Sequence, residues 1–273
     1  MEFCERPATG STPRSGPASR VVGVVLALVL ALVGAPLRAL GDDANPMDSV
    51  FEVFTYTKAG KGVARGTAFF IDSSGLALTN SHVVYRARHD PAGYVLLAVV
   101  GQEFYSAEVV CASELNEDPT VSSKGPVERD IAQIRLVPPN TDFAPWGILP
   151  GGGARILARA HIGPMPAFPV LPLADGQPNG QIRVIGYGKA SQPSEKTVAT
   201  GTVTRTAVAR DGTPVFEIRS EGRPERGASG SPVLDDQNRV VGMYTWNDLD
   251  NATSGLAISS TALTRACPSS HRL

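Results

Sequence analysis

One serine in the sequence lies in a loop suited to nucleophilic catalysis. Residues 226–233 read RGASGSPV, and the glycines and proline around Ser229 predict a tight loop that ends where a strand begins. Gly227 has no Cβ, so the backbone amides of Gly227 and Ser229 can point into one small space. A carbonyl oxygen placed there would gain two hydrogen-bond donors as it becomes an oxyanion, while the Ser229 hydroxyl attacks its carbon. The loop therefore predicts acyl transfer, with Ser229 as nucleophile and the amides of Gly227 and Ser229 as oxyanion hole.

A serine nucleophile needs a histidine base, and the base needs a carboxylate that holds its tautomer. Of the 4 histidines, His82 lies in the run ALTNSHVV at residues 77–84, which follows a strand-like run at residues 66–71 and a turn at residues 72–75. Asp130 opens an alternating run at residues 130–136, which predicts a strand. We expect His82 to be the general base and Asp130 to be the acid that orients it.

The order of these residues along the chain restricts the class of enzyme. His82 comes first, then Asp130, then Ser229. This order excludes the α/β-hydrolases, in which the serine precedes the acid and the histidine, and Ser231 also breaks the glycine pattern of their nucleophile turn. Each residue alone is weak evidence, because a Gly-x-Ser-Gly sequence is more often a simple turn. Their joint order favours a Ser-His-Asp triad.

Two motifs carry a resemblance to a known family. The runs LTNSHVV at residues 78–84 and SGSPV at residues 229–233 resemble those of the trypsin/chymotrypsin-like serine peptidases. They are most similar to the bacterial branch that includes the staphylococcal, V8-like glutamyl endopeptidases and, more distantly, the HtrA proteases. The resemblance covers about residues 50–260. It implies an all-β fold of two six-stranded antiparallel β-barrels of the chymotrypsin type, with the active site in the cleft between them. It also implies a serine endopeptidase that cleaves polypeptide through an acyl-enzyme.

The residue pattern itself also favours an all-β protein. Short alternating or β-branched runs, separated by Gly, Pro, Asn and Asp, predict strands from Val50 onward. The predicted strands are residues 51–57, 66–71, 94–100, 106–111 and 131–137 in the first half, and 169–173, 182–188, 200–208, 215–219, 232–234 and 240–246 in the second. No stretch has the pattern of a long amphipathic helix, and residues 261–267 predict at most a final helical turn or two.

The sequence predicts three regions: a signal segment at residues 1–41, a first barrel at residues 42–145 with His82 and Asp130, and a second barrel at residues 146–273 with Ser229. Arginines precede the apolar run at residues 21–33, and small residues stand before Asp42, as in a secretory signal. We expect a periplasmic or secreted protein. An uncleaved membrane anchor at residues 21–37 is the alternative, because that run approaches the ~20 residues of a membrane span.

Cysteines and charge exclude several function classes. Cys111 and Cys267 lie outside the signal segment, and export would allow one disulfide between them. Two unpaired buried thiols are the alternative. With 25 Lys and Arg against 26 Asp and Glu, the chain has no basic surplus for nucleic acid. No His/Cys spacing predicts a metal site, and we expect no cofactor.

The resemblance further implies where a substrate would bind. The family's substrate edge strand, whose backbone pairs with an extended peptide, corresponds to Tyr244, Thr245, Trp246 and Asn247. Gly255 falls on the wall of the specificity pocket, where the absence of a side chain keeps the pocket open. Arg223 falls near the pocket floor and would favour an acidic substrate side chain if it points inward. A solvated Arg223 is the alternative, and Tyr244 stands where the glutamyl-specific enzymes have a histidine.

Two departures from the animal digestive enzymes bear on activation. Ala228 stands where those enzymes have the acid that pairs with a newly cut amino terminus, so activation by that route is not expected. Val83 stands where they have a cysteine. The alternative function is a catalytically inactive barrel that acts as a binding module of the cell envelope. An HtrA-like protease with a PDZ module is not expected, since few residues follow Ser260. The sequence does not indicate an oligomeric state.

Overall fold

The computed structural model describes residues 45–115, 129–140, 158–174, 180–188, 195–221, 227–247 and 254–265, and for Trp246 and Asn247 the backbone alone. These residues belong to the second of two units into which the chain divides, residues 43–273. Across them, no helix has the length and apolar character that a membrane span requires. The predicted signal segment, Arg223 and Cys267 lie outside the described residues.

The first barrel is formed by antiparallel strands in the order β4-β1-β2-β3-β6-β5, and pairing of β4 with β5 closes it. Its strands are β1 (Val50–Thr57), β2 (Gly62–Phe70), β3 (Leu76–Thr79), β4 (Tyr94–Val100), β5 (Glu103–Ala112) and β6 (Ala132–Val137). Side chains such as Phe51, Phe70 and Ile134 fill the interior. The short strand β7 (Arg159–Ala160) pairs in parallel with β5 and adds a seventh strand to this sheet.

The second barrel closes in the order β10-β13-β12-β11-β8-β9. Its strands are β8 (Gln181–Tyr187), β9 (Lys196–Val208), β10 (Pro214–Ser220), β11 (Pro232–Leu234), β12 (Val240–Asn247) and β13 (Ser254–Ser259). Phe216, Val233 and Ala257 are among the buried residues of its core. The predicted all-β class and the two six-stranded antiparallel barrels are confirmed.

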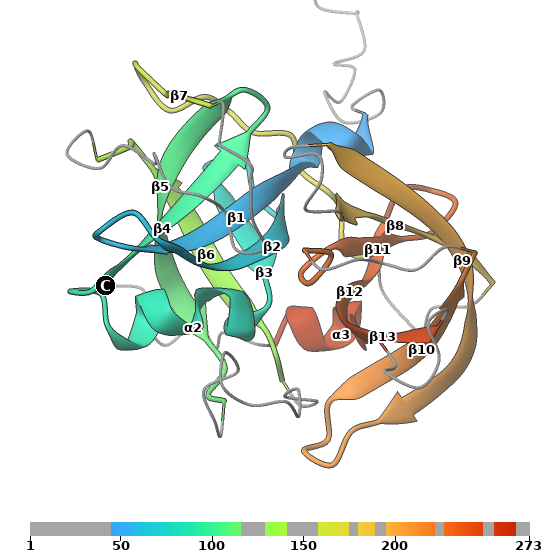
Figure 1. Ribbon diagram of the computed structural model, residues 1–273. Coiled ribbons are helices and arrows are strands. Elements are labelled where there is room, and N and C mark those ends of the chain that lie inside the picture. The colour runs from blue at the N-terminus through green and yellow to red at the C-terminus, as the bar shows by residue number, and fades with distance from the viewer. Residues whose placement is uncertain are drawn as a thin grey trace, which may run out of the picture. The chain divides into compact units, whose positions relative to one another are not determined.

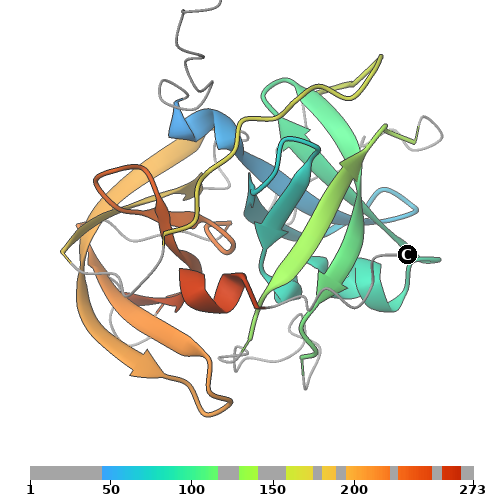
Figure 2. The same cartoon turned by 180° about the vertical axis from the view of Figure 1, so that it is seen from behind.

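A shared apolar cluster joins the two barrels, which lie next to each other in Figures 1 and 2. It combines Val50, Phe69, Leu78 and Ile131 of the first barrel with Ile185, Leu234, Val240 and Met243 of the second. Because both barrels bury side chains in this cluster, elements on either side of the junction are held in a defined relation. The residues predicted to do chemistry lie on these elements.

Among the described residues, three short helices interrupt the strands: η1 (Pro46–Ser49), α2 (Ser81–His89) and α3 (Ser260–Leu263). The last agrees with the helical turn predicted near the end of the chain. The sequence analysis did not predict α2. Its nine residues carry few apolar side chains, and the helix is stabilised by burial of Val83 and Val84 against the first barrel rather than by its own periodicity.

The strand predicted at residues 169–173 is wrong. This segment makes only an isolated bridge, from Leu173 to Val240, and the second barrel begins with β8 instead. Pro169 and Pro172 have no N–H group to donate, which prevents a regular ladder of hydrogen bonds. The N–H of Leu171 donates to Phe70, and the carbonyl oxygen of Pro172 accepts from Val240, so the segment lies across the junction.

Candidate active site

His82 lies in the first turn of α2, which follows the end of β3 after one intervening residue. Asn80 precedes the helix in an extended conformation, as is usual for an N-cap residue, and basic residues occupy the last turn. The carbonyl oxygen of Val83 accepts a hydrogen bond of 2.8 Å from the Thr55 hydroxyl, which anchors the helix to β1. The imidazole of His82 is 17% exposed, so the ring is held by the fold but remains accessible.

Asp130 lies immediately before β6 and its side chain is fully buried. Oδ2 of Asp130 is 2.6 Å from Nδ1 of His82, and Oδ1 accepts a hydrogen bond of 2.9 Å from the backbone N–H of His82. A third donor is the hydroxyl of Thr245 on β12, which lies 2.8 Å from Oδ2. Since a buried carboxylate loses its hydration, these three donors compensate for the water that it would otherwise bind.

The main chain around Asp130 is held equally tightly. The side-chain amide of Asn80 donates to the carbonyl oxygen of Asp130 (2.6 Å), and the Ser81 hydroxyl donates to that of Ile131 (2.7 Å). Arg129 has a φ of 49°, and the N–H of Ile131 donates to the Arg129 carbonyl oxygen at 2.6 Å. The chain therefore turns sharply at Asp130 and presents its carboxylate to the first turn of α2. No sequence signal indicated that Asn80 and Ser81 would hold this segment.

Ser229 is half-buried in the loop before β11, and the glycines around it have the conformation that the sequence suggested. Gly227 has a φ of 108° and Gly230 a φ of 87°, both in the region that disfavours other residues. A Cβ on Gly227 would lie 2.7 Å from the carbonyl oxygen of Tyr187. The N–H groups of Gly230 and Ser231 donate to Tyr244 and Ala228 respectively. Those of Gly227 and Ser229 make no hydrogen bond to any other described residue.

The Ser229 loop and the first turn of α2 meet at Gly66 of β2. A Cβ on Gly66 would lie 2.5 Å from Cγ2 of Val83 and 3.1 Å from the carbonyl oxygen of Ser229. The neighbour of His82 and the backbone of Ser229 thus contact the same point, although they belong to different barrels. Within the described part of the chain, the Ser229 hydroxyl makes no hydrogen bond. The roles of His82, Asp130 and Ser229 in catalysis stay predictions.

Comparison with protein families identifies the domain. The family model described as a trypsin-like peptidase domain matches residues 66–243. This range begins at Gly66 and includes His82, Asp130 and Ser229. The chain belongs to the trypsin-like peptidase family.

Solved structures have the same fold at low sequence identity. The Rv3671c protease of M. tuberculosis in its active form is 19% identical, covers 97% of this chain and 92% of its own, and has a TM-score of 0.53. The serine endoprotease of Yersinia pestis is 16% identical, with 80% of this chain and 61% of its own covered and a TM-score of 0.52. Deg5 is 16% identical, with 80% and 87% covered and a TM-score of 0.53. A search of curated protein sequences gives no match.

In this trypsin-like peptidase domain, the strand predicted to bind substrate is β12, which pairs with β13 from Gly242 to Asn247 but with β11 only as far as Met243. Thr245 is only 3% exposed, and its side chain faces Asp130. Tyr244 is also buried, and its ring lies against Gly255: a Cβ on that glycine would be 2.5 Å from Cε2 of Tyr244. The space that the sequence analysis expected to be open beside Gly255 is therefore occupied by the Tyr244 ring.

Other predicted positions of the peptidase domain are described only in part. Trp246 and Asn247 lie on β12, and the position of Arg223 is outside the described residues. Cys111 on β5 is disulfide-bonded, which overturns the alternative of a free thiol at this position. The pairing with Cys267 stays a prediction. The described residues contain no group of three or more His, Cys, Asp or Glu side chains that could hold a metal ion.

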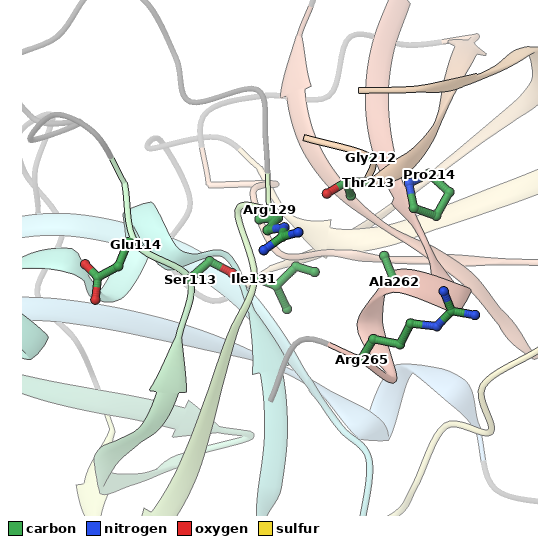
Figure 3. A pocket seen from close by; sticks show the side chains of 9 residues that line it. All are labelled: Ser113, Glu114, Arg129, Ile131, Gly212, Thr213, Pro214, Ala262 and Arg265. Atoms are coloured by element: carbon green, nitrogen blue, oxygen red, sulfur yellow. The ribbon is translucent and has the colours of Figure 1, made fainter. Parts of the chain in front are cut away.

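A cavity of about 530 Å³ lies on another part of the peptidase domain. Figure 3 shows its lining: Ser113, Glu114, Arg129, Ile131, Gly212, Thr213, Pro214, Ala262 and Arg265. Arg129 and Ile131 flank Asp130 in the sequence, but neither His82 nor Ser229 lines the cavity. It is therefore not the place where a bond under attack by Ser229 would lie.

Proposed function

We propose that the chain is an exported serine endopeptidase that uses His82, Asp130 and Ser229 as its catalytic triad. The observation that carries the proposal is the contact of 2.6 Å between Nδ1 of His82 and the fully buried Oδ2 of Asp130. Such a pair fixes the histidine tautomer in which Nδ1 carries the proton and Nε2 acts as the base. The loop of Ser229 reaches the same helix turn through Gly66, which supports Ser229 as the proton donor.

The proposed reaction begins with proton transfer from the Ser229 hydroxyl to Nε2 of His82. The oxygen attacks the carbonyl carbon of a peptide bond and gives a tetrahedral intermediate. His82 then donates the proton to the leaving amine, the C–N bond breaks, and an acyl-enzyme remains on Ser229. The Asp130 carboxylate orients the imidazole and stabilises the imidazolium in both steps. Water, activated by His82, releases the acyl group by the reverse sequence of transfers.

The N–H groups of Gly227 and Ser229 form the proposed oxyanion hole. No other described residue accepts a hydrogen bond from them, so both can donate to a developing oxyanion. Removing one such donor typically costs about 3 to 4 kcal/mol of transition-state stabilisation. The effect requires that the loop is held in one conformation before the substrate arrives. Free energy spent on reordering the loop during the reaction would offset the stabilisation of the transition state.

The substrate is a polypeptide, as the peptidase family implies. We propose that the backbone of β12 pairs with it as an added strand, with Thr245, Trp246 and Asn247 at the contact. The N–H and carbonyl oxygen of Tyr244 already bond to Ser231 and Gly230, so the added strand would begin beyond Tyr244. Preference for an acidic side chain, through Arg223, is the finer proposal and would agree with a V8-like branch. The Tyr244 ring beside Gly255 reduces the room for a large side chain there. Cleavage-site mapping on a denatured protein mixture would show whether acidic side chains are preferred at the cleaved position and whether large ones are excluded.

The experiment that tests the activity compares two serines of the same loop. Ser229→Ala is expected to lower kcat by about a millionfold and to abolish labelling by a fluorophosphonate, because only an activated serine reacts. Ser231→Ala is the matched control, since that hydroxyl is buried and has no hydrogen-bond partner in the described structure. Unchanged hydrolysis by folded Ser229→Ala protein would reject the assignment. An unreactive wild-type protein would favour a binding module of the cell envelope instead.

Export is a separate part of the proposal and rests on the arginines and apolar run within residues 1–41. Fractionation of expressing cells and sequencing of the mature amino terminus test it. A mature protein that begins near Asp42 would support cleavage. Recovery of the full chain from the membrane would support an anchor at residues 21–37, and recovery from the cytoplasm would overturn export.

A further inference from the structure

Thr67 on β2 uses all its polar groups to bind segments around the candidate site. Its side chain is fully buried at the junction between the two barrels. Its backbone N–H donates to the carbonyl oxygen of Ser229 (2.8 Å), and its hydroxyl donates to that of Gly227 (2.8 Å). The same hydroxyl accepts a hydrogen bond of 3.1 Å from the N–H of Tyr187 on β8. One residue of the first barrel therefore binds both proposed oxyanion-hole residues of the second.

The surroundings leave little freedom at this position. Gly186 and Gly230 both lie against Thr67: a Cβ on Gly186 would be 3.2 Å from its hydroxyl oxygen, and a Cβ on Gly230 would overlap its carbonyl oxygen. That carbonyl oxygen also accepts a hydrogen bond of 2.7 Å from the Thr79 hydroxyl. Only a small side chain with a group that both donates and accepts satisfies Gly227 and Tyr187 at once, which is the property of a hydroxyl.

The carbonyl of Gly227 needs a hydrogen bond from outside the loop to fix its orientation. A glycine at a φ of 108° has a wide range of accessible backbone angles, so its peptide groups can rotate at low cost. The Thr67 hydroxyl holds the carbonyl after Gly227, and the Thr67 N–H holds the carbonyl after Ser229. The Gly227 carbonyl shares its peptide group with the N–H of Ala228, and the Ser229 carbonyl shares its own with the N–H of Gly230. The N–H of Ser229 belongs to the one peptide group between these two, and the N–H of Gly227 belongs to the peptide group just before them. Fixing both carbonyls therefore limits the rotation of both amides.

We propose that Thr67 is a positioning residue that holds the oxyanion-stabilising amides of Gly227 and Ser229 from the opposite barrel. The proposal rests on the proposed function. Thr67 does not contact the reacting atoms and acts through the loop. Loss of its hydroxyl should therefore weaken stabilisation of the transition state while leaving binding of the ground-state peptide unchanged.

The test compares Thr67→Val, which keeps the shape and removes the hydroxyl, with Thr67→Ser, which keeps the hydroxyl. Thr67→Val is expected to lower kcat by about 10- to 100-fold, less than the full loss of one oxyanion donor, with KM nearly unchanged. The rate of fluorophosphonate labelling should fall by the same factor. Thr67→Ser is expected to retain wild-type kcat. Wild-type kcat in Thr67→Val, or an equal loss in Thr67→Ser, would overturn the proposal.

Ser260→Ala is the matched control for a general loss of stability. The Ser260 hydroxyl is also fully buried and donates to a backbone carbonyl oxygen, that of Ala174, at 2.7 Å. We expect this variant to lose stability comparably to Thr67→Val and to keep its kcat. If the two variants lose kcat equally, Thr67 contributes to stability alone and the positioning role is wrong.

Amide hydrogen exchange separates failure of this proposal from failure of the proposed function, because it needs no activity. In Thr67→Val, the loop amides of Gly230 and Ser231, which donate to the carbonyl oxygens of Tyr244 and Ala228, are expected to exchange faster than in the wild type. Amides of β10 and β13 serve as the internal reference. Unchanged exchange in the loop overturns the positioning role. Faster exchange in a wild-type-like barrel that hydrolyses nothing supports it and rejects only the peptidase assignment.

Discussion

The hydroxyl of Thr245 donates a hydrogen bond of 2.8 Å to Oδ2 of Asp130, so a strand of the second barrel supplies a hydrogen-bond donor to a carboxylate of the first. The same oxygen lies 2.6 Å from Nδ1 of His82. Asp130 is fully buried, and a buried carboxylate depends on every donor it has. The geometry of the His82–Asp130 pair therefore depends on contact between the two barrels.

Removal of this hydroxyl is expected to destabilise the protein and slow the reaction. A hydrogen bond to a charged group contributes about 1.5 to 3 kcal/mol, so Thr245→Val should lower the free energy of unfolding by that amount. It should also lower kcat, because the carboxylate is free to rotate away from the imidazole. Thr245→Ser keeps the donor and should retain both properties. Urea unfolding and steady-state kinetics measure the two effects. An unchanged kcat in Thr245→Val would separate Thr245 from the active site.

Asp130→Asn is expected to lower kcat by about 10⁴-fold without loss of the fold. The asparagine amide presents N–H groups to Nδ1 of His82, which selects the tautomer that cannot accept the Ser229 proton. Asp235→Asn provides the control, since Asp235 also accepts backbone N–H groups, from Gln237 and Arg239, but lies in the turn between β11 and β12. Comparable losses in both variants would argue against a specific role for Asp130.

His161 and Glu103 should make stability depend on pH. Nδ1 of His161 lies 2.8 Å from Glu103 Oε2, and Nε2 lies 3.0 Å from the carbonyl oxygen of Pro164. The hydrogen bond to Glu103, and then that to Pro164, raise the pKa of His161 above 6.5. The hydrogen bond from His161 lowers the pKa of Glu103 below 4.5, and Tyr105 and Arg159 add to this effect.

The sign of each pKa shift defines the pH range in which the pair stabilises the fold. The contribution of His161 is complete below pH 6.5 and is lost as pH rises through the raised pKa. That of Glu103 is present above pH 4.5 and is lost as pH falls through the lowered pKa. The difference in Tm between the wild type and His161→Gln should therefore be largest between these values and decline on both sides. A difference that does not vary with pH would contradict this prediction.

The ion pair of Glu52 and Arg65 is expected to stabilise the barrel junction. Glu52 is fully buried, and Nε of Arg65 donates to its Oε1 at 2.6 Å. Burial, and secondly the Glu52 charge, raise the pKa of Tyr187 on β8 of the second barrel. Glu52→Gln leaves the guanidinium buried without its counterion and should cost about 3 to 5 kcal/mol.

An exposed ion pair offers the comparison for Glu52→Gln. Arg159 pairs with Glu103 across 3.2 Å, but the Arg159 side chain is 79% exposed. Because solvent screens such a pair, Arg159→Gln should change the free energy of unfolding by at most about 1 kcal/mol. Urea unfolding of both variants gives the two values. Equal values would show that burial does not determine the contribution of the Glu52–Arg65 pair.

Strands were predicted accurately where the residue pattern along the chain marks them, and less accurately where contacts distant in the sequence decide the structure. Residues 94–100 and 232–234 were predicted with the bounds of β4 and β11, because alternation and β-branched side chains mark them along the chain. The helix α2 was missed, since its stability comes from Val83 and Val84 packing on the barrel. The segment at residues 169–173 has apolar residues at strand spacing, but its prolines prevent pairing.

By itself, the sequence determined the order of His82, Asp130 and Ser229, the glycine loop around Ser229, and the alternation typical of an all-β protein. The order is read directly from the chain, and the loop and the alternation are short-range patterns that neighbouring residues establish. Only the tertiary structure decided that Thr245 donates to Asp130 and that Thr67 holds Gly227, pairs separated by 115 and 160 residues. Such contacts arise when two barrels bury a common surface, and no local periodicity records which side chains then meet.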